Sequence, residues 1–539
     1  MHVHHNAEEM MHLHKTLAVL VAALAVSMLA GCPAGPCREK TQCTTGCADL
    51  SSDAMSCGAC GNACPFNDAC YHGVCRPLVS VGPASNKTDI LFMVDNSNGM
   101  SAKSEQLKVR FGGFAQLFSD AAAAGSPADL DIAVVTSDYG AGKTGSPGCQ
   151  PSPGGQQGRM QALGVAAPQG CLPPTGNVNF VHFDFDATHT NTSNLPASQN
   201  LAQTFTCMAS VGSMGCGFEH QLESVFAALH NPIPDNKDFL RDDARLAIVF
   251  VTDEDDSSAP PDSDMFDKSA SAMWGYEDSY RQTRWGIMCD PDGSLPPYGD
   301  SGGPLSNCVP ATNPPGAEYD VQRYIDFFTN PASKGGVKGN PVDVSMFAID
   351  GPGPMEGGTV QVILSNPSTT GGQPYTPCSP LNEGSNPACV PVLQHSCQNP
   401  KNPVFDGDPA VRLNTVVRSA RGGSFIGSIC DDDYSASLRT IAQKILAAGI
   451  PGCLLGAPAN AAKPDCLVED VTENGDGTQT STLITSCASS GGAPPCWSIA
   501  AQAKCSVVSP VALQLSVTRS PGAPPLPPHT ATTAVCVTQ

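Results

Sequence analysis

The stretch Thr88-Asp89-Ile90-Leu91-Phe92-Met93-Val94-Asp95, residues 88–95, is an apolar run that ends in a carboxylate. Such a run is typical of a buried parallel strand, and ligands bind outside the carboxyl ends of such strands. Comparable runs follow at 129–137 (DLDIAVVTS), 246–252 (LAIVFVT) and 342–349 (VDVSMFAI). The run at 246–252 is also followed by an acid, Asp253. We therefore expect four buried strands, two of which carry acids at their carboxyl ends.

Helical patterns separate these strands. In residues 101–121, Leu107, Phe111, Phe114 and Leu117 recur at helical spacing. Further helices are expected at 218–229 and 435–448. Strands that alternate with helices predict an α/β fold with a doubly wound, mostly parallel sheet.

Composition narrows the class of protein. The chain has 539 residues, 28 Lys and Arg, and 50 Asp and Glu, so its formal net charge is −22. A nucleic-acid partner is not expected, because binding phosphates requires a basic face. The 53 Gly and 48 Pro residues favour many turns and long loops. The 25 Cys residues indicate an oxidising compartment and a disulfide framework.

The N-terminal sequence is expected to be an export signal. Residues 16–30 form an apolar run after Lys15, too short for a membrane span of about 20 residues. The ending Leu29-Ala30-Gly31-Cys32 resembles a bacterial lipobox, which implies a signal peptide over 1–31, a lipid on Cys32 and a tether over 32–36. An ordinary signal peptide with a chance cysteine is the alternative, and the true start is open among Met1, Met10 and Met11.

The lipobox also bears on location. Pro33 follows Cys32 where an inner-membrane retention signal would place Asp. By resemblance to Gram-negative lipoproteins, this implies the outer membrane, with the lipid as the only membrane anchor. The sequence leaves open whether the protein faces the periplasm or the cell surface.

A cysteine-rich module is expected over 37–79, because so short a segment needs covalent staples. Its cysteines are Cys37, Cys43, Cys47, Cys57, Cys60, Cys64, Cys70 and Cys75. The stretch Cys57 to Cys64 with Cys70 and Cys75 resembles the stigma-specific-protein-like module of bacterial surface lipoproteins. A zinc knuckle is the alternative, since Cys57-x-x-Cys60 has zinc-ligand spacing. The pairing stays open.

Long Gly/Pro-rich insertions interrupt the α/β pattern at about 139–205, 257–320 and 350–415. Each contains cysteines, so local disulfides are expected within them. Residues 451–539 differ: they hold six cysteines and strand-like runs such as 511–517 (VALQLSV). We expect a small disulfide-bonded β domain there.

Three segments carry hard oxygen ligands at expected strand or helix ends. They are 95–101 (DNSNGMS), 212–217 (GSMGCG) and 252–256 (TDEDD). Carboxylates and hydroxyls that converge at one edge of a parallel sheet can hold Mg²⁺ or Mn²⁺ and leave a position open for a partner's carboxylate. The acidic run 254–256 is itself expected to be a solvated loop.

This order resembles the von Willebrand factor type A domain and its metal-ion-dependent adhesion site, over roughly residues 86–448. That motif is Asp-x-Ser-x-Ser, then a Thr in a distant loop, then an Asp after a later strand. Asp95, Ser97 and Asp253 match, whereas Gly99 stands where the second Ser belongs. Ser101 is a candidate substitute two residues late, and Ser213 is a candidate for the Thr.

The segments 215–219 (GCGFE) and 429–433 (ICDDD) look like those of bacterial surface lipoproteins with this domain. The resemblance implies a non-enzymatic adhesion or protein-binding module that engages a protein or cell-surface polymer, through an acidic group and a divalent cation (Mg²⁺, Mn²⁺ or Ca²⁺). Because Gly99 removes a hydroxyl, the alternative is an envelope scaffold whose metal site does not function.

One motif points to an enzyme. Residues 299–305 (GDSGGPL) reproduce the nucleophile motif of trypsin-like serine proteases, with Ser301 as nucleophile. The mechanism needs a histidine base in an Ala-Ala-His-Cys context, which the chain lacks. We therefore expect no enzyme and keep a serine hydrolase as a remote alternative.

Overall fold

The computed structural model describes residues 40–538, except 44–45, 54–55, 63, 65–67, 82–84, 144, 147, 153, 187–191, 231, 268–273, 275–278, 291–303, 313–316, 367–377, 379–388, 475–477, 525 and 528–529. The predictions for the signal peptide, Cys32, Cys37 and Ser301 lie outside these residues. The chain divides into two compact units, Met1–Leu78 and Val79–Gln539.

The first unit is held by disulfides, as expected. Cys43 pairs with Cys60, Cys57 with Cys70, and Cys64 with Cys75. Two short hairpins lie between them: β1 (Thr41–Cys43) with β2 (Gly46–Ala48), and β3 (Asp68–Tyr71) with β4 (Val74–Ser80). Because Cys57 and Cys60 are both disulfide-bonded, they do not form the alternative zinc knuckle.

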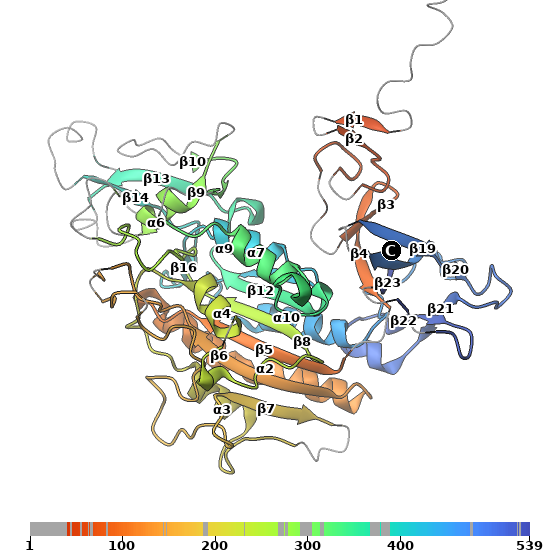
Figure 1. The fold of residues 1–539 in the computed structure, drawn as a ribbon, viewed down its shortest axis with the longest axis horizontal. Coiled ribbons are helices and arrows are strands. Elements are labelled where there is room, and N and C mark those ends of the chain that lie inside the picture. Colours follow the sequence, from red (N-terminus) through yellow and green to blue (C-terminus); the bar gives the residue numbers. More distant parts are fainter. Residues whose placement is uncertain are drawn as a thin grey trace, which may run out of the picture. The chain divides into compact units, whose positions relative to one another are not determined.

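The second unit is built around a six-stranded sheet in the order β17-β12-β8-β5-β6-β7 (Figure 1). Its strands are β5 (Lys87–Val94), β6 (Ala128–Thr136), β7 (Phe180–Phe185), β8 (Arg245–Val251), β12 (Val344–Asp350) and β17 (Ser424–Ser428). Every neighbouring pair is parallel except β6 with β7. The four strands expected from the sequence are confirmed, and β7 and β17 flank them.

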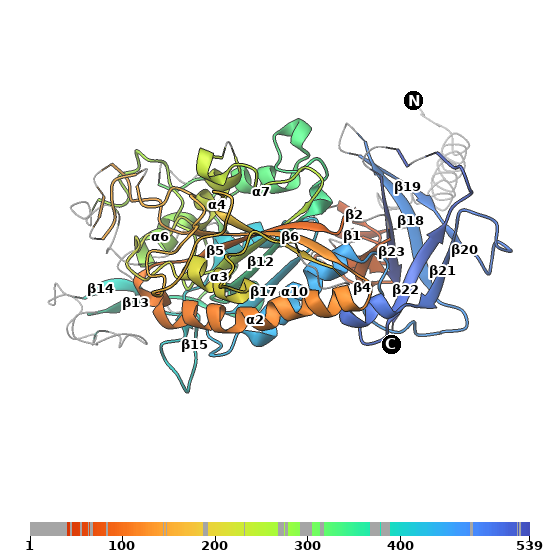
Figure 2. The same ribbon diagram turned by 90° about the horizontal axis from the view of Figure 1, so that it is seen from below.

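Helices cover both faces of this sheet, with α2 and α10 on one side and α4 and α7 on the other (Figure 2). On the first face lie α2 (Ser101–Ala123), α3 (Leu201–Ala209) and α10 (Ser435–Gly449). On the second lie α4 (Gln221–Leu229), α7 (Gln322–Thr329) and α9 (Val411–Arg418). The expected helices at 101–121 and 435–448 are confirmed, and the one expected at 218–229 begins at Gln221.

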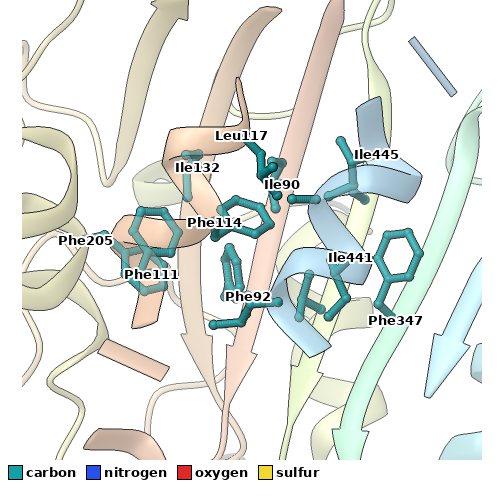
Figure 3. Packing of buried hydrophobic residues seen from close by; sticks show 14 of the residues in the cluster. Ile90, Phe92, Phe111, Phe114, Leu117, Ile132, Phe205, Phe347, Ile441 and Ile445 are labelled. Atoms are coloured by element: carbon teal, nitrogen blue, oxygen red, sulfur yellow. The ribbon is translucent and has the colours of Figure 1, made fainter. Parts of the chain in front are cut away.

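The alternation of side chains along β5 explains why both faces need cover. Ile90, Phe92 and Val94 belong to the cluster under α2, whereas Leu91 and Met93 belong to the cluster under α4. On the first face Phe92 packs against Phe111 and Phe114 of α2 and Phe205 of α3, while Ile441 of α10 lies beside it (Figure 3). Burial on both faces is typical of a strand inside a parallel sheet. Asp95 directly follows β5, at its carboxyl end.

The insertions have their own structure, and some are tied to the rest of the chain. The expected local disulfides are present as Cys289–Cys308 and Cys378–Cys389. Three others reach further than expected: Cys149 pairs with Cys216, Cys171 with Cys207, and Cys397 with Cys430. The expectation of local pairing was wrong there, because these cysteines join the insertions to α3 and to loops at the sheet edge.

Short elements fill the insertions. They are α6 (Ser279–Gly286), β9 (Ile287–Met288), β10 (Pro304–Leu305), β11 (Val309–Pro310), β13 (Val360–Ser365), β14 (Val390–Leu393), β15 (Cys397–Gln398) and β16 (Asp406–Gly407). All the pairs that they form are antiparallel.

Beyond α10 the described residues form mainly β strands, within the same compact unit as the central sheet. Its strands are β18 (Cys466–Glu473), β19 (Gln479–Leu483), β20 (Thr485–Ser486), β21 (Cys496–Ala501), β22 (Leu513–Thr518) and β23 (Thr530–Cys536). Disulfides 453–505, 466–536 and 487–496 staple them.

The protein is therefore a mixed α/β structure in which antiparallel sheets accompany the central sheet. Its many disulfides indicate folding in an oxidising compartment. Within the described residues, no helix combines the length and apolarity needed to cross a bilayer.

Candidate metal centre

Asp95 is held rigidly at the carboxyl end of β5. It directly follows Val94, and its side chain is fully buried. Its Oδ1 accepts hydrogen bonds from the Ser97 backbone N–H at 2.8 Å and from Ser137 Oγ at 2.9 Å. Thr252 Oγ1 donates to its Oδ2 at 2.7 Å. These neutral donors orient the carboxylate without neutralising its charge.

Asp253 emerges at the same edge, because β8 is the parallel neighbour of β5. It is buried, and Lys103 Nζ donates to its Oδ2 at 2.6 Å. Burial raises the pKa of Asp253 to about 7, against the lowering effect of Lys103 and with a further rise from the charge of Asp95. Its Oδ1 is buried without a hydrogen-bond partner among the described residues. That orphaned oxygen fits a group that binds a cation.

Lys103 was not anticipated from the sequence. It lies in the first turn of α2 and is completely buried, and its ammonium also donates to Asp406 Oδ1 at 2.6 Å. Burial alone would lower the pKa of Lys103, but the two carboxylates outweigh it and raise the pKa. Lys103 therefore places a permanent positive charge beside the expected metal ligands.

Gly99 has a structural consequence beyond its missing hydroxyl. A Cβ at position 99 would lie 2.2 Å from Asp253 Oδ2, so the carboxylate occupies space that a side chain there would need. Ser97 is buried at the start of the short turn 98–100, whereas Ser101 is exposed as the first residue of α2. Ser101 thus differs in exposure from Asp95, Ser97 and Asp253, which are all buried.

The loop between α3 and α4, which contains the segment 212–217, presents a further carboxylate. Sequence analysis did not assign this residue, Glu219, to the site. Ser213 is half-buried, whereas Glu219 of the same loop is fully buried with both carboxylate oxygens unpartnered among the described residues. Burial raises the pKa of Glu219 well above its usual range, and the charges of Glu254, Asp95 and Asp253 raise it further. The sequence signal was a lone Glu between Phe218 and His220, both also buried.

The acidic run 254–256 is not the solvated loop that we expected. Asp255 is buried and accepts hydrogen bonds from the backbone N–H groups of Val411, Arg412 and Leu413 at the start of α9. Asp256 accepts from the backbone N–H of Leu222 in the first turn of α4. Helix N-termini favour such anions, so two of the three acids fix the helices around the site.

His395 completes an ion network behind Lys103. Its Nδ1 lies 2.5 Å from Asp408 Oδ1, and its Nε2 lies 3.2 Å from Asp406 Oδ2. Burial alone would lower the pKa of His395, but the hydrogen bonds to Asp406 and Asp408 raise it to about 10. Burial alone would raise the pKa of Asp406, but the hydrogen bonds from His395 and Lys103 hold it below its usual range.

Replacing His395 by Asn should therefore destabilise the protein in a pH-dependent way. A folded pKa above the unfolded value of about 6.5 gives stability that is complete below that value and is lost as pH rises through about 10. We expect the free energy of unfolding to fall by on the order of 2 kcal/mol at pH 6, and by progressively less toward pH 10. Urea unfolding of both proteins across this range tests it, and a pH-independent difference would contradict it.

In the described part of the chain, two groups of three possible metal-ligand atoms lie within 4.8 Å of one another, and both are outside this site. Cys57, Cys64 and Cys75 form one, but all three are in disulfides. Asp129, Asp131 and His182 form the other, in which Arg241 already pairs with both acids. The carboxylate oxygens of Asp95, Glu219 and Asp253 do not all lie within 4.8 Å of one another.

The chain was compared with known proteins. It matches no protein-family model and no curated protein. Among solved structures, it is similar to the pilus adhesin SpaC from Lactobacillus rhamnosus GG (open conformation), with 9% identity and a TM-score of 0.27, over 85% of this chain and 38% of that one. It is also similar to the pilus adhesin RrgA from Streptococcus pneumoniae, with 10% identity and a TM-score of 0.24, over 85% and 58%. The chain thus spans well under two thirds of either adhesin, and TM-scores this low do not define a shared fold.

Proposed function

We propose that this protein is a lipid-anchored envelope lipoprotein whose central domain, residues 86–448, is a type A-like, non-enzymatic binding module. It engages an acidic group of a protein or cell-surface polymer through a divalent cation. Asp95, Ser97 and Asp253 hold the ion, and the partner's carboxylate completes its shell. Support comes chiefly from the two buried carboxylates at adjacent strand ends, one with an orphaned oxygen.

The three contributing residues have distinct roles. Asp95 is already oriented by three neutral donors. Ser97 supplies a hydroxyl from the adjoining turn. Asp253 offers Oδ1, while its Oδ2 stays with Lys103. A cation bound there would offset buried negative charge and present an open position to the partner.

Binding to an acidic probe tests the proposal. Immobilised poly-L-glutamate and alginate should retain the purified, oxidised protein in Mg²⁺, Mn²⁺ or Ca²⁺ but not in chelator, since a net charge of −22 otherwise repels them. Asp95→Asn should abolish the retention. Equal retention of the variant would indicate nonspecific bridging and would refute the site.

A scaffold role is the second candidate, and Lys103 favours it. Its ammonium already neutralises Asp253 and Asp406, and Gly99 lacks the motif's hydroxyl. In that case no divalent cation would change the stability of the protein. A serine hydrolase using Ser301 remains the remote alternative, and it requires ester hydrolysis that Ser301→Ala abolishes.

The lipid anchor has its own test. Changing Cys32 to Ser removes the thiol that would be acylated, so the protein should move almost entirely from the membrane fraction to the soluble fraction. Immunoblots of fractionated cells measure this change. Persistent membrane association of the variant would show that Cys32 is not the anchor.

A further inference from the structure

The most exceptional group near the site is the carboxylate of Glu219. The side chain is entirely buried, and neither Oε1 nor Oε2 has a hydrogen-bond partner among the described residues. Burying an isolated carboxylate is costly unless it is neutralised or bound to a cation. A position at the start of a buried helix would be filled more cheaply by an apolar residue.

The loop that carries Glu219 is fastened to both of the other loops. Gly215 N–H donates to the Asn96 carbonyl at 2.7 Å, and His220 N–H donates to the Ser137 carbonyl at 2.9 Å. Ser257 donates to the Glu219 carbonyl through its N–H and its Oγ, both at 2.8 Å. The position of Glu219 between the other two loops is therefore fixed by the backbone.

Hydrogen bonds of Gln221, two residues after Glu219, strengthen this arrangement. Gln221 Nε2 donates to Thr252 Oγ1 at 3.0 Å, and that hydroxyl donates onward to Asp95 Oδ2. Gly215 itself has no room for a side chain, because a Cβ would lie 2.5 Å from the Asn96 side chain. The cystine 149–216 braces the same loop from outside.

The cationic side chains of this region are already paired with acids other than Glu219. Lys103 pairs with Asp253 and Asp406, His395 with Asp406 and Asp408, and Arg412 with Asp256 and Glu318. Within the described residues, no ion pair involves Glu219. Within the same residues, Asp95 and the half-buried Glu254 form no ion pair either, and Asp253 shares the ammonium of Lys103 with Asp406.

We propose that Glu219 is a direct ligand of the cation, in place of the hydroxyl missing at Gly99, and that the site consequently prefers Ca²⁺ to Mg²⁺. The inference rests on the proposed function. Glu can chelate through both oxygens, which suits the six to eight oxygens around Ca²⁺, whereas Mg²⁺ demands a strict octahedron and retains its waters. Glu254 is half-buried, and its Oε2 accepts a hydrogen bond from Gln282 Nε2.

Calorimetric titration of the full, oxidised, chelator-treated chain with CaCl₂ and MgCl₂ tests this inference. The protein should bind Ca²⁺ at least tenfold more tightly than Mg²⁺. Glu219→Gln should weaken Ca²⁺ binding at least tenfold, and Asp95→Asn should abolish it. Glu223→Gln is the matched control: its buried carboxylate bonds to Arg323 and Tyr324 instead, so Ca²⁺ affinity should stay within twofold of wild type.

Stability separates a ligand from a merely structural residue. Without metal, Glu219→Gln should melt at or above the wild-type temperature, because it removes an unpaired buried carboxylate. In Ca²⁺ it should melt below wild type, because it no longer gains from binding. A variant that melts below wild type equally with and without Ca²⁺ would overturn the proposal.

The possible outcomes distinguish the role of Glu219 from the proposed cation-dependent binding function. Wild-type Ca²⁺ affinity in Glu219→Gln, together with loss in Asp95→Asn, would overturn the role of Glu219 and leave the proposed function standing. Absence of binding in the wild type would overturn both. If Glu219→Gln fails to fold, Glu219→Asp retains the charge on a shorter arm, and an unchanged Ca²⁺ to Mg²⁺ ratio in it would count against the proposal.

Discussion

Replacing Lys103 by Met should lower the free energy of unfolding by about 3–5 kcal/mol, the cost of breaking a buried ion pair from one side. Asp253 and Asp406 would both lose their ammonium partner, and Asp253 is buried with one oxygen already unpartnered. Met has a similar length, so the loss would come from charge rather than from a cavity. Denaturant unfolding of the oxidised protein at pH 7 in chelator measures it.

Lys108→Met is the matched control for this change. Lys108 lies on the same helix, and its partner Glu105 is largely exposed, so its loss should cost no more than about 0.5 kcal/mol. Equal effects of the two substitutions would contradict the importance of the buried pair. If a divalent cation also binds Asp253, adding that cation should recover part of the stability lost in Lys103→Met.

Arg412→Met should have a comparably large effect, again about 3–5 kcal/mol. Arg412 is buried at the start of α9 and pairs with Asp256 and Glu318, two fully buried acids. Its Nη2 and Nε also donate to the carbonyls of Tyr319 and Asp256. Without the guanidinium, these acids and carbonyls would stay buried without their partner, and the loop that carries Asp253 would lose its support.

The measurement is the same denaturant unfolding, with Arg110→Met as control. Arg110 is half-buried on α2, and its partner Asp433 is exposed, so the loss of this solvent-accessible pair should cost no more than about 0.5 kcal/mol. An Arg412→Met protein as stable as the control would show that the buried network contributes little.

Sequence periodicity predicted the central strands well because each is apolar on both faces. β5, β6, β8 and β12 are long buried runs, and such runs have few alternatives in a chain of this composition. Among the elements that escaped prediction, two did so for identifiable reasons. β17 is a short segment, SFIGS, after two glycines, and its strand state depends on pairing with β12. α9, VRLNTVVR, is rich in β-branched residues, which disfavour helices, and it relies on the remote cap from Asp255.

The candidate site was only partly predictable for a related reason. Asp95 and Asp253 follow apolar strands, so their common edge can be inferred from local pattern. Lys103 and Glu219 act through contacts with residues 150 or more positions away or through loop packing, which no local pattern encodes. The acidic run 254–256 misled the analysis because its partners, the first turns of α4 and α9, are distant in the sequence.

The central claim is that this sheet edge binds a divalent cation through Asp95. Thermal unfolding of the oxidised protein in Mg²⁺, Mn²⁺, Ca²⁺ or chelator, beside Asp95→Asn, tests it most directly. A cation that binds only the folded state raises the midpoint, by about 2.7 kcal/mol of stabilisation at a hundredfold excess over Kd. We predict a rise with at least one cation that Asp95→Asn abolishes. A midpoint that no cation changes, or one that rises equally in the variant, would contradict the claim.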